Sequence, residues 1–111
     1  MKLSKVQIKA HDQVMALVAL DRPLTEDEKW FVLENFHEGA MHINSKAGAF
    51  FTPSGLARDF SLHVTGPRII DLCAGIGSLA FACRDRASEL VCVEINPDYA
   101  RIGKKVVPEA N

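Results

Sequence analysis

Two acidic residues and two glycines stand at spacings that suit a nucleoside-binding site. Asp71 lies within one short apolar segment, Gly75 and Gly77 follow it, and Glu94 lies near the end of a second apolar segment. Glycines in such a turn let the backbone approach a ligand closely, because no Cβ blocks the contact. An acid at the end of the next strand is placed to accept hydrogen bonds from a ribose diol. The pattern therefore predicts a site for a nucleoside-bearing cofactor.

The same pattern departs from the dinucleotide fingerprint G-x-G-x-x-G. Glu94 lies 17 residues after Gly77 (94 − 77), close to the roughly 20 of that fingerprint. Ala80 stands where the third glycine would be, so a nicotinamide cofactor is the weaker alternative. Another alternative is a purely structural strand-to-helix turn, with Glu94 in solvent and Asp71 accepting turn amides.

The elements that would position these residues form a βαβα unit. Residues 68–73 and 89–95 are apolar enough for parallel strands buried on both faces, and residues 79–83 between them read as helical. Asn96 and Pro97 are a typical cap and first residue of a last helix. Thr52 and Pro53 form a similar pair, for a helix that reaches Leu62 and ends near residues 66–67. A right-handed crossover is expected between the strands.

The first half of the chain is predicted to be helical. Apolar residues recur at three- and four-residue steps over residues 3–20, behind a cap at Ser4. Thr25 and Glu28 form a capping box for a second helix, which would end near Gly39. We therefore expect one α/β domain, with a helical part at residues 1–48 and the cofactor-binding part at residues 49–111.

Three segments in order resemble one protein family. The string Asp71-Leu72-Cys73-Ala74-Gly75-Ile76-Gly77 resembles the first motif of the Rossmann-like S-adenosylmethionine-dependent methyltransferases, and Val93-Glu94-Ile95 resembles their second. The segment at residues 49–57, which contains Phe51-Thr52-Pro53, resembles the F-x-T-P-type segment of adenine-N6 DNA methyltransferases and related phage and plasmid enzymes. The resemblance covers about residues 49–107 and implies a truncated Rossmann-like unit with a short parallel sheet.

The resemblance also implies roles for individual residues. Phe51, Thr52 and Pro53 would flank the methionine end of S-adenosylmethionine, and Asp71 with the backbone from Ala74 through Gly75 to Gly77 would hold that end. Glu94 would bind the ribose, and Ile95 would pack on the adenine.

The catalytic segment of that family, D/N/S-P-P-Y/F/W, has no counterpart in this sequence. Asn96-Pro97-Asp98-Tyr99 lacks the second proline and directly follows the Glu94 strand, so it reads as a helix start. We therefore expect cofactor binding without turnover by this chain alone, and no catalytic residue is assigned. The alternative is a mobile-element inhibitor of the anti-restriction or anti-CRISPR type, or an adaptor, that binds a partner protein through this scaffold.

Composition limits the other classes of function. The 111 residues carry a net charge of −1 with no basic arm, so strong nucleic-acid binding by this chain alone is disfavoured. The sequence contains neither a membrane span nor a secretory signal, and Cys73, Cys83 and Cys92 fit reduced, mostly buried thiols of a cytoplasmic protein. No metal site is expected, because His37 and His42 would lie on different helix faces.

Two parallel strands expose more apolar surface than their own helices cover. The N-terminal helices, a second copy or a partner protein would have to cover the remainder. From this we expect a homodimer or a complex with a protein that completes the sheet.

Overall fold

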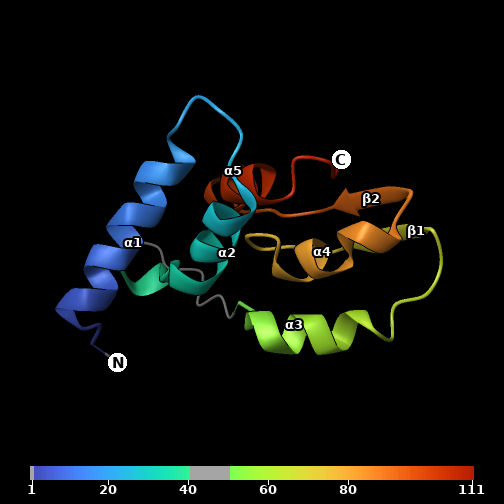
Figure 1. Cartoon of the computed structure of the whole chain (residues 1–111), viewed down its shortest axis with the longest axis horizontal. Coiled ribbons are helices and arrows are strands. Elements are labelled where there is room, and N and C mark those ends of the chain that lie inside the picture. The colour runs from blue at the N-terminus through green and yellow to red at the C-terminus, as the bar shows by residue number, and fades with distance from the viewer. Residues whose placement is uncertain (1, 41–50) are drawn as a thin grey trace. The chain divides into compact units, whose positions relative to one another are not determined.

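A computed structural model describes residues 2–40 and 51–111 of the chain (Figure 1). The chain divides into two units, Met1–Phe50 and Phe51–Asn111. His42 and the first two residues of the segment at 49–57 lie outside the described residues.

Helices α1 (Lys5–Val18) and α2 (Glu26–Asn35) form the first unit. Ser4 caps α1 as expected, and Gln7 completes a capping box that the sequence analysis did not identify. Val14 of α1 and Val32 of α2 are fully buried. The periodic apolar residues of α1 mark its packed face only in part, because Val6 and Ile8 are exposed.

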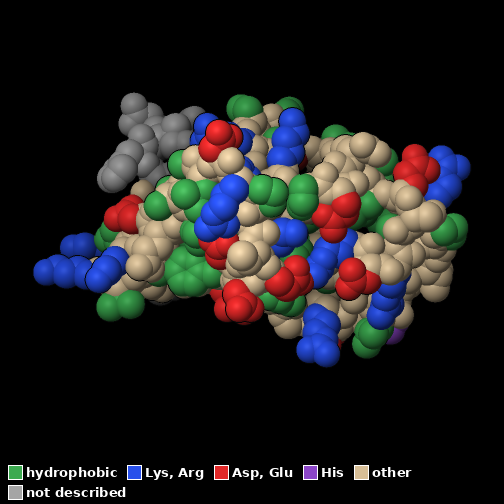
Figure 2. Space-filling model, turned by 45° about the horizontal axis from the view of Figure 1, so that its top comes forward, with side chains coloured by type: hydrophobic (Ala, Val, Ile, Leu, Met, Phe, Trp, Pro, Cys, Tyr) green, Lys and Arg blue, Asp and Glu red, His purple; other side chains and the backbone are tan. Residues whose placement is uncertain are grey.

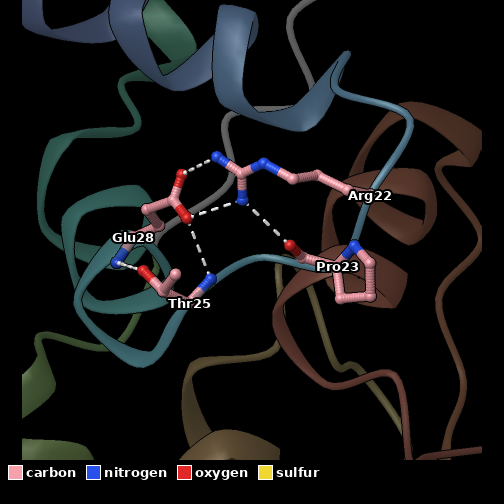
Figure 3. Close-up of polar contacts among 4 residues, drawn as sticks. All are labelled: Arg22, Pro23, Thr25 and Glu28. Carbon is pink, nitrogen blue, oxygen red and sulfur yellow. Dashed lines mark hydrogen bonds and ion pairs between the residues drawn. The ribbon is translucent and has the colours of Figure 1, made fainter.

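The start of α2 confirms the predicted capping box (Figure 3). The N–H of Glu28 donates to Thr25 Oγ1 at 3.3 Å, and the N–H of Thr25 donates to Glu28 Oε1 at 2.9 Å. Arg22 adds a two-pronged contact, with Nη1 and Nη2 at 2.8 and 3.0 Å from the Glu28 carboxylate. One carboxylate thus ties the loop before α2 to its first turn.

The end of α2 differs from the prediction. The helix ends at Asn35, and a separate 3-10 turn, η1, covers Glu38–Ala40. The N–H of His37 donates to Nδ1 of the buried His11, at 3.0 Å, and the His11 ring lies 5.0 Å from that of Phe36. Because this N–H is used across to α1, it does not continue the α2 ladder toward Gly39.

The second unit contains a parallel pair of strands, β1 (Arg68–Asp71) and β2 (Glu89–Cys92), in the register Arg68↔Glu89 to Asp71↔Cys92. Helix α4 (Ser78–Cys83) and the 3-10 turn η2 (Arg84–Arg86) connect them. Helix α3 (Ser54–Ser61) precedes β1 and packs on α4. Helix α5 (Pro97–Val106) follows β2. The order βαβα is as predicted, and the described residues have an α/β fold.

Two predicted boundaries in this unit are wrong. Pro53, not Thr52, is the N-cap of α3, because its extended backbone places its carbonyl to accept the N–H of Ala57. The helix stops at Ser61, before Leu62. Both strands are also shorter than expected. The chain turns directly after Asp71, and β2 ends at Cys92, although the N–H of Val93 still donates to Asp71 O.

The strands are not buried on both faces, which corrects the expectation from their apolar sequence. Leu90 is buried, but the neighbouring side chains of the opposite face are exposed: Ile70 to 58%, Leu72 to 67% and Val93 to 46%. Asn111 pairs with the free edge of β2, donating its N–H to Leu90 O and accepting from the N–H of Cys92. This is the bond pattern of one parallel bridge.

Several surface features concern the predicted class of protein. Charges of both signs are interspersed over the face drawn in Figure 2. Among residues 2–40 and 51–111, no helix is both long enough and apolar enough to cross a bilayer. All three cysteines are free, but Cys73 is exposed and Cys92 half-buried, so only Cys83 matches the expectation of burial.

Candidate functional site

The glycine turn after β1 is built by backbone hydrogen bonds that only glycine permits easily. The N–H of Ala74 donates to Val93 O at 3.0 Å, and the N–H of Gly77 donates to Ala74 O at 2.9 Å. Gly75 has φ +56° and Gly77 has φ +97°, both in the left-handed region. Gly77 is also the N-cap of α4. The bond from Ala74 to Val93 therefore holds the turn that follows β1 against the chain that follows β2.

Glu94 joins the turn to the segment that starts α5. Its Oε2 accepts the N–H of Gly75 at 2.7 Å, and its Oε1 accepts the N–H of Asn96 at 2.9 Å. Asn96 in turn caps α5, with Oδ1 at 3.0 Å from the N–H of Asp98. A carboxylate has about four acceptor positions, so Glu94 keeps the capacity to accept two further donors.

Asp71, the last residue of β1, has a carboxylate oxygen without a hydrogen-bond partner among the described residues. Its Oδ1 accepts the N–H of Cys73 at 3.3 Å, while its Oδ2 is buried without a hydrogen-bond partner among the described residues. Burial raises the pKa of the Asp71 carboxyl, and the negative charge of Glu94 raises it further. A buried acceptor in this state gains free energy when a ligand supplies a donor or a positive charge.

The segment before α3 contributes an aromatic side chain to the turn. A Cβ built on Gly75 would lie 3.2 Å from Cδ1 of Phe51, so the Phe51 ring lies directly against the glycine. The same ring meets Tyr99 of α5 edge to face, with the centroids 5.1 Å apart. Thr52 is half-buried and Pro53 is exposed.

A cavity of about 250 Å³ lies between the glycine turn and α5. Its lining includes four of the predicted residues, Ala74, Gly75, Gly77 and Glu94. Drug-sized ligands usually occupy about 300–1,000 Å³, so this cavity suits part of a cofactor rather than all of it. The other predicted residues lie outside the lining: Phe51, Thr52, Pro53, Asp71 and Ile95. The side chain of Ile95 is 98% exposed.

Helix α5 contributes to this cavity, which the sequence motifs do not predict. Gly103 and Lys104 line it, and a Cβ on Gly103 would lie 3.6 Å from the carbonyl oxygen of Gly75. A glycine inside a helix is unfavourable and often has a packing reason. The position of Gly103 within the predicted last helix was therefore the available signal. Asn111 also lines the cavity, and no local pattern indicated this.

Cys92 is the one thiol in the lining, and its environment makes it a poor nucleophile. Burial raises the pKa of Cys92 to about 11, and the charges of Asp71 and Glu109 act in the same direction. The thiol is therefore protonated at neutral pH, whereas nucleophilic cysteines are thiolates. Within the part of the chain that the structure describes, no group of three or more His, Cys, Asp or Glu side chains could hold a metal ion.

The arrangement is suited to binding rather than to bond-making. Its lining offers the Glu94 carboxylate to hydrogen-bond donors or to a cation, beside small residues that permit close approach, whereas the buried Oδ2 of Asp71 lies outside the lining. Comparisons with family models, with curated proteins and with solved structures give no match.

Proposed function

We propose that this chain binds S-adenosylmethionine at the glycine turn, in the manner of a Rossmann-like methyltransferase, and does not transfer the methyl group on its own. The observation that carries the proposal is the meeting of Gly75 and Glu94 at the ends of two adjacent parallel strands. Open parallel sheets bind nucleotides at this edge, outside the carboxyl ends of the strands.

The residues present fit such a cofactor. The remaining acceptor positions of Glu94 suit a ribose diol. The unsatisfied Oδ2 of Asp71 suits the ammonium of the methionine end in charge, but it is buried outside the cavity lining, so this contact requires the turn to move when the ligand binds. Ile95 is exposed beside Glu94 and offers an apolar surface to a base. S-adenosylmethionine supplies an electrophilic methyl group on its sulfonium when it is bound. This chain's part is to hold and orient the molecule through Asp71, Glu94 and the turn.

The absence of turnover is part of the proposal. The sequence has no D/N/S-P-P-Y/F/W segment that would hold an acceptor amine. Methyl transfer would then require an acceptor site supplied from outside these residues. A radiolabelled methyl-transfer assay on DNA, RNA and protein is expected to show no turnover by this chain alone.

Titration calorimetry of the whole chain with S-adenosylmethionine and S-adenosylhomocysteine tests the binding. We expect binding by the wild type and its loss in Glu94→Ala. Glu89→Ala is the matched control, because Glu89 is an exposed carboxylate at the opposite end of β2, paired with Arg68 at 2.7 Å. Binding that survives in Glu94→Ala, or a wild type that binds neither compound, would refute the proposal.

The exposed face of the sheet favours a second candidate function. Ile70 on β1, Leu72 directly after β1 and Val93 directly after β2 are exposed apolar side chains, and these three residues are called the apolar strip. Exposed apolar side chains that lie together mark interaction sites. An inhibitor or adaptor from a mobile element would use such a strip to bind a partner protein, or a second copy of this chain, that completes the sheet. Direct binding of nucleic acid is the weaker form of this proposal, because the net charge is −1.

Light scattering during size exclusion tests this second function. If the strip mediates self-association, the wild type forms a dimer whose thermal midpoint rises with protein concentration, and Leu72→Glu is monomeric with a midpoint that does not depend on concentration. A wild type that remains monomeric up to high concentration would eliminate the homodimer and leave a different protein as the partner.

A further inference from the structure

We infer that Tyr99 is a positioning residue for the ligand site, because its ring holds Phe51 against the glycine turn. Tyr99 was read from the sequence only as part of a helix start. This inference rests on the proposed function, since it concerns how the same site is kept ready for its ligand.

Tyr99 is connected to Gly75 by two separate sets of contacts. On one side, the N–H of Gly75 donates to Glu94, which also accepts from the N–H of Asn96. The side chain of Asn96 accepts from the N–H of Tyr99 at 3.4 Å. On the other side, the Tyr99 ring meets Phe51, which lies against Gly75. The hydrogen bonds fix the backbone of Tyr99, and its ring then fixes Phe51.

The geometry of the two rings supports a specific rather than a merely space-filling contact. Their planes are 85° apart with centroids at 5.1 Å, the edge-to-face arrangement that the charge distribution of aromatic rings favours. Tyr99 is 4% exposed, so its ring is held by its surroundings. Phe51 begins its unit directly before α3 and is half-buried. The Tyr99 ring is therefore one of the contacts that hold the Phe51 ring beside Gly75.

A fixed Phe51 lowers the cost of binding. Without the Tyr99 ring, the side chain beside Gly75 would have to be ordered when a ligand arrives, and that ordering would reduce affinity. Ordering one side chain on binding costs about 0.5–1.5 kcal/mol, which corresponds to an affinity change of about two- to tenfold.

Calorimetry of the whole chain with S-adenosylhomocysteine measures this change. We expect Tyr99→Leu to bind about two- to tenfold more weakly than the wild type, while Tyr99→Phe keeps most of the affinity. Val106→Ala is the control for a general loss of packing, because Val106 is fully buried on the same helix and does not line the cavity. It should lower the free energy of unfolding without weakening the binding.

A second measurement does not depend on a Tyr99 variant that folds. The chain has one Trp and one Tyr, so in Trp30→Phe the tyrosine emission comes from Tyr99 alone. Binding at the turn should change this emission saturably, with the midpoint found by calorimetry.

The outcomes separate the inference from the proposed function. If the wild type binds neither S-adenosylmethionine nor S-adenosylhomocysteine, both fail. If it binds, but Tyr99→Leu has wild-type affinity or the emission of Tyr99 does not respond, only the role of Tyr99 is refuted.

Discussion

The backbone N–H of Gly75 donates to the carboxylate of Glu94 at 2.7 Å, although the two residues are 19 apart in sequence. The parallel pairing of β1 and β2 brings them together, because the carboxyl ends of parallel strands lie at the same edge of the sheet. Glu94 therefore has a structural role beside the binding role proposed for it. A hydrogen bond from an amide to a charged group contributes more than one between neutral groups.

Replacing this carboxylate is expected to destabilise the fold as well as to weaken binding. Glu94→Gln keeps one acceptor oxygen, but its amide nitrogen faces an N–H donor, so one of the two backbone bonds is lost. We expect the free energy of unfolding to fall by about 1.5–3 kcal/mol. Urea denaturation measures the change.

Glu89→Gln provides the control for this experiment. Glu89 pairs with Arg68 at the surface, with side chains 48% and 80% exposed, and exposed pairs contribute at most about 1 kcal/mol. Equal losses of unfolding free energy in the two variants would show that the Gly75–Glu94 bond contributes no more than an exposed ion pair.

Much of the local structure could be predicted because the signals are short. Asn96 and Pro97 start α5 as expected, and Thr25 and Glu28 form their capping box. Gly75 and Gly77 adopt left-handed conformations directly after the first predicted strand. Each of these features depends on a few neighbouring residues whose side chains or backbone freedom satisfy local hydrogen bonds.

The features that escaped prediction depend on distant contacts. The end of α2 is set by His11, 26 residues away from the His37 N–H that it accepts. The burial of Asp71 Oδ2 and the approach of Gly103 to Gly75 arise only when strands and helices pack. The apolar sequence of the strands could not reveal which face stays exposed, since Ile70 and Leu90 look alike in sequence and differ in burial.

The left-handed backbone of Gly77 gives a prediction with an internal control. Gly77→Ala places a Cβ at φ +97°, 3.1 Å from Cγ2 of Val107, and we expect a loss of at least about 1–2 kcal/mol from the backbone alone. In Gly55→Ala the new Cβ meets nothing within 4 Å and the residue lies in α3. That variant should be neutral or gain up to about 1 kcal/mol. Thermal unfolding compares the two, and a similar effect in both would contradict the assigned turn geometry.

The Arg22–Glu28 contact predicts a pH dependence for the first unit. The hydrogen bond from Arg22 lowers the pKa of Glu28 from an ordinary 4.5 to about 2, and the N–H of Thr25 acts in the same direction. Because the folded pKa lies below the unfolded one, this contribution to stability is fully present above pH 4.5 and is lost as the pH falls through 2.

Titration of the Glu28 carboxyl by NMR measures this pKa directly. Arg22→Ala should move it upward, toward its ordinary value, because the first cause of the shift is then removed. Arg68→Ala is the control, since its guanidinium pairs with Glu89 instead. A Glu28 pKa that is the same in the wild type and in Arg22→Ala would show that the contact in Figure 3 is not maintained in solution.

Asp71 is expected to favour binding at the expense of stability. Burial raises the pKa of its carboxyl above the ordinary 3.8, so the folded chain binds the proton more tightly than the unfolded chain does. The ionised carboxylate therefore destabilises the fold as the pH rises through the interval between 3.8 and the folded pKa. Asp71→Asn removes this charge and can keep the contact of Oδ1 with the N–H of Cys73.

We thus expect Asp71→Asn to unfold at a higher urea concentration than the wild type at pH 7, with a gain of up to about 1 kcal/mol, and the difference should vanish below pH 3.8. The same variant should bind S-adenosylhomocysteine more weakly, because an amide does not attract an ammonium group as a carboxylate does. An Asp71→Asn variant that is both less stable at pH 7 and unchanged in affinity would identify Asp71 as an ordinary structural acceptor of the turn. A variant that gains stability and loses binding would identify Asp71 as a ligand-binding residue. Its unsatisfied oxygen lowers the stability of the free protein and is useful only when a ligand is bound.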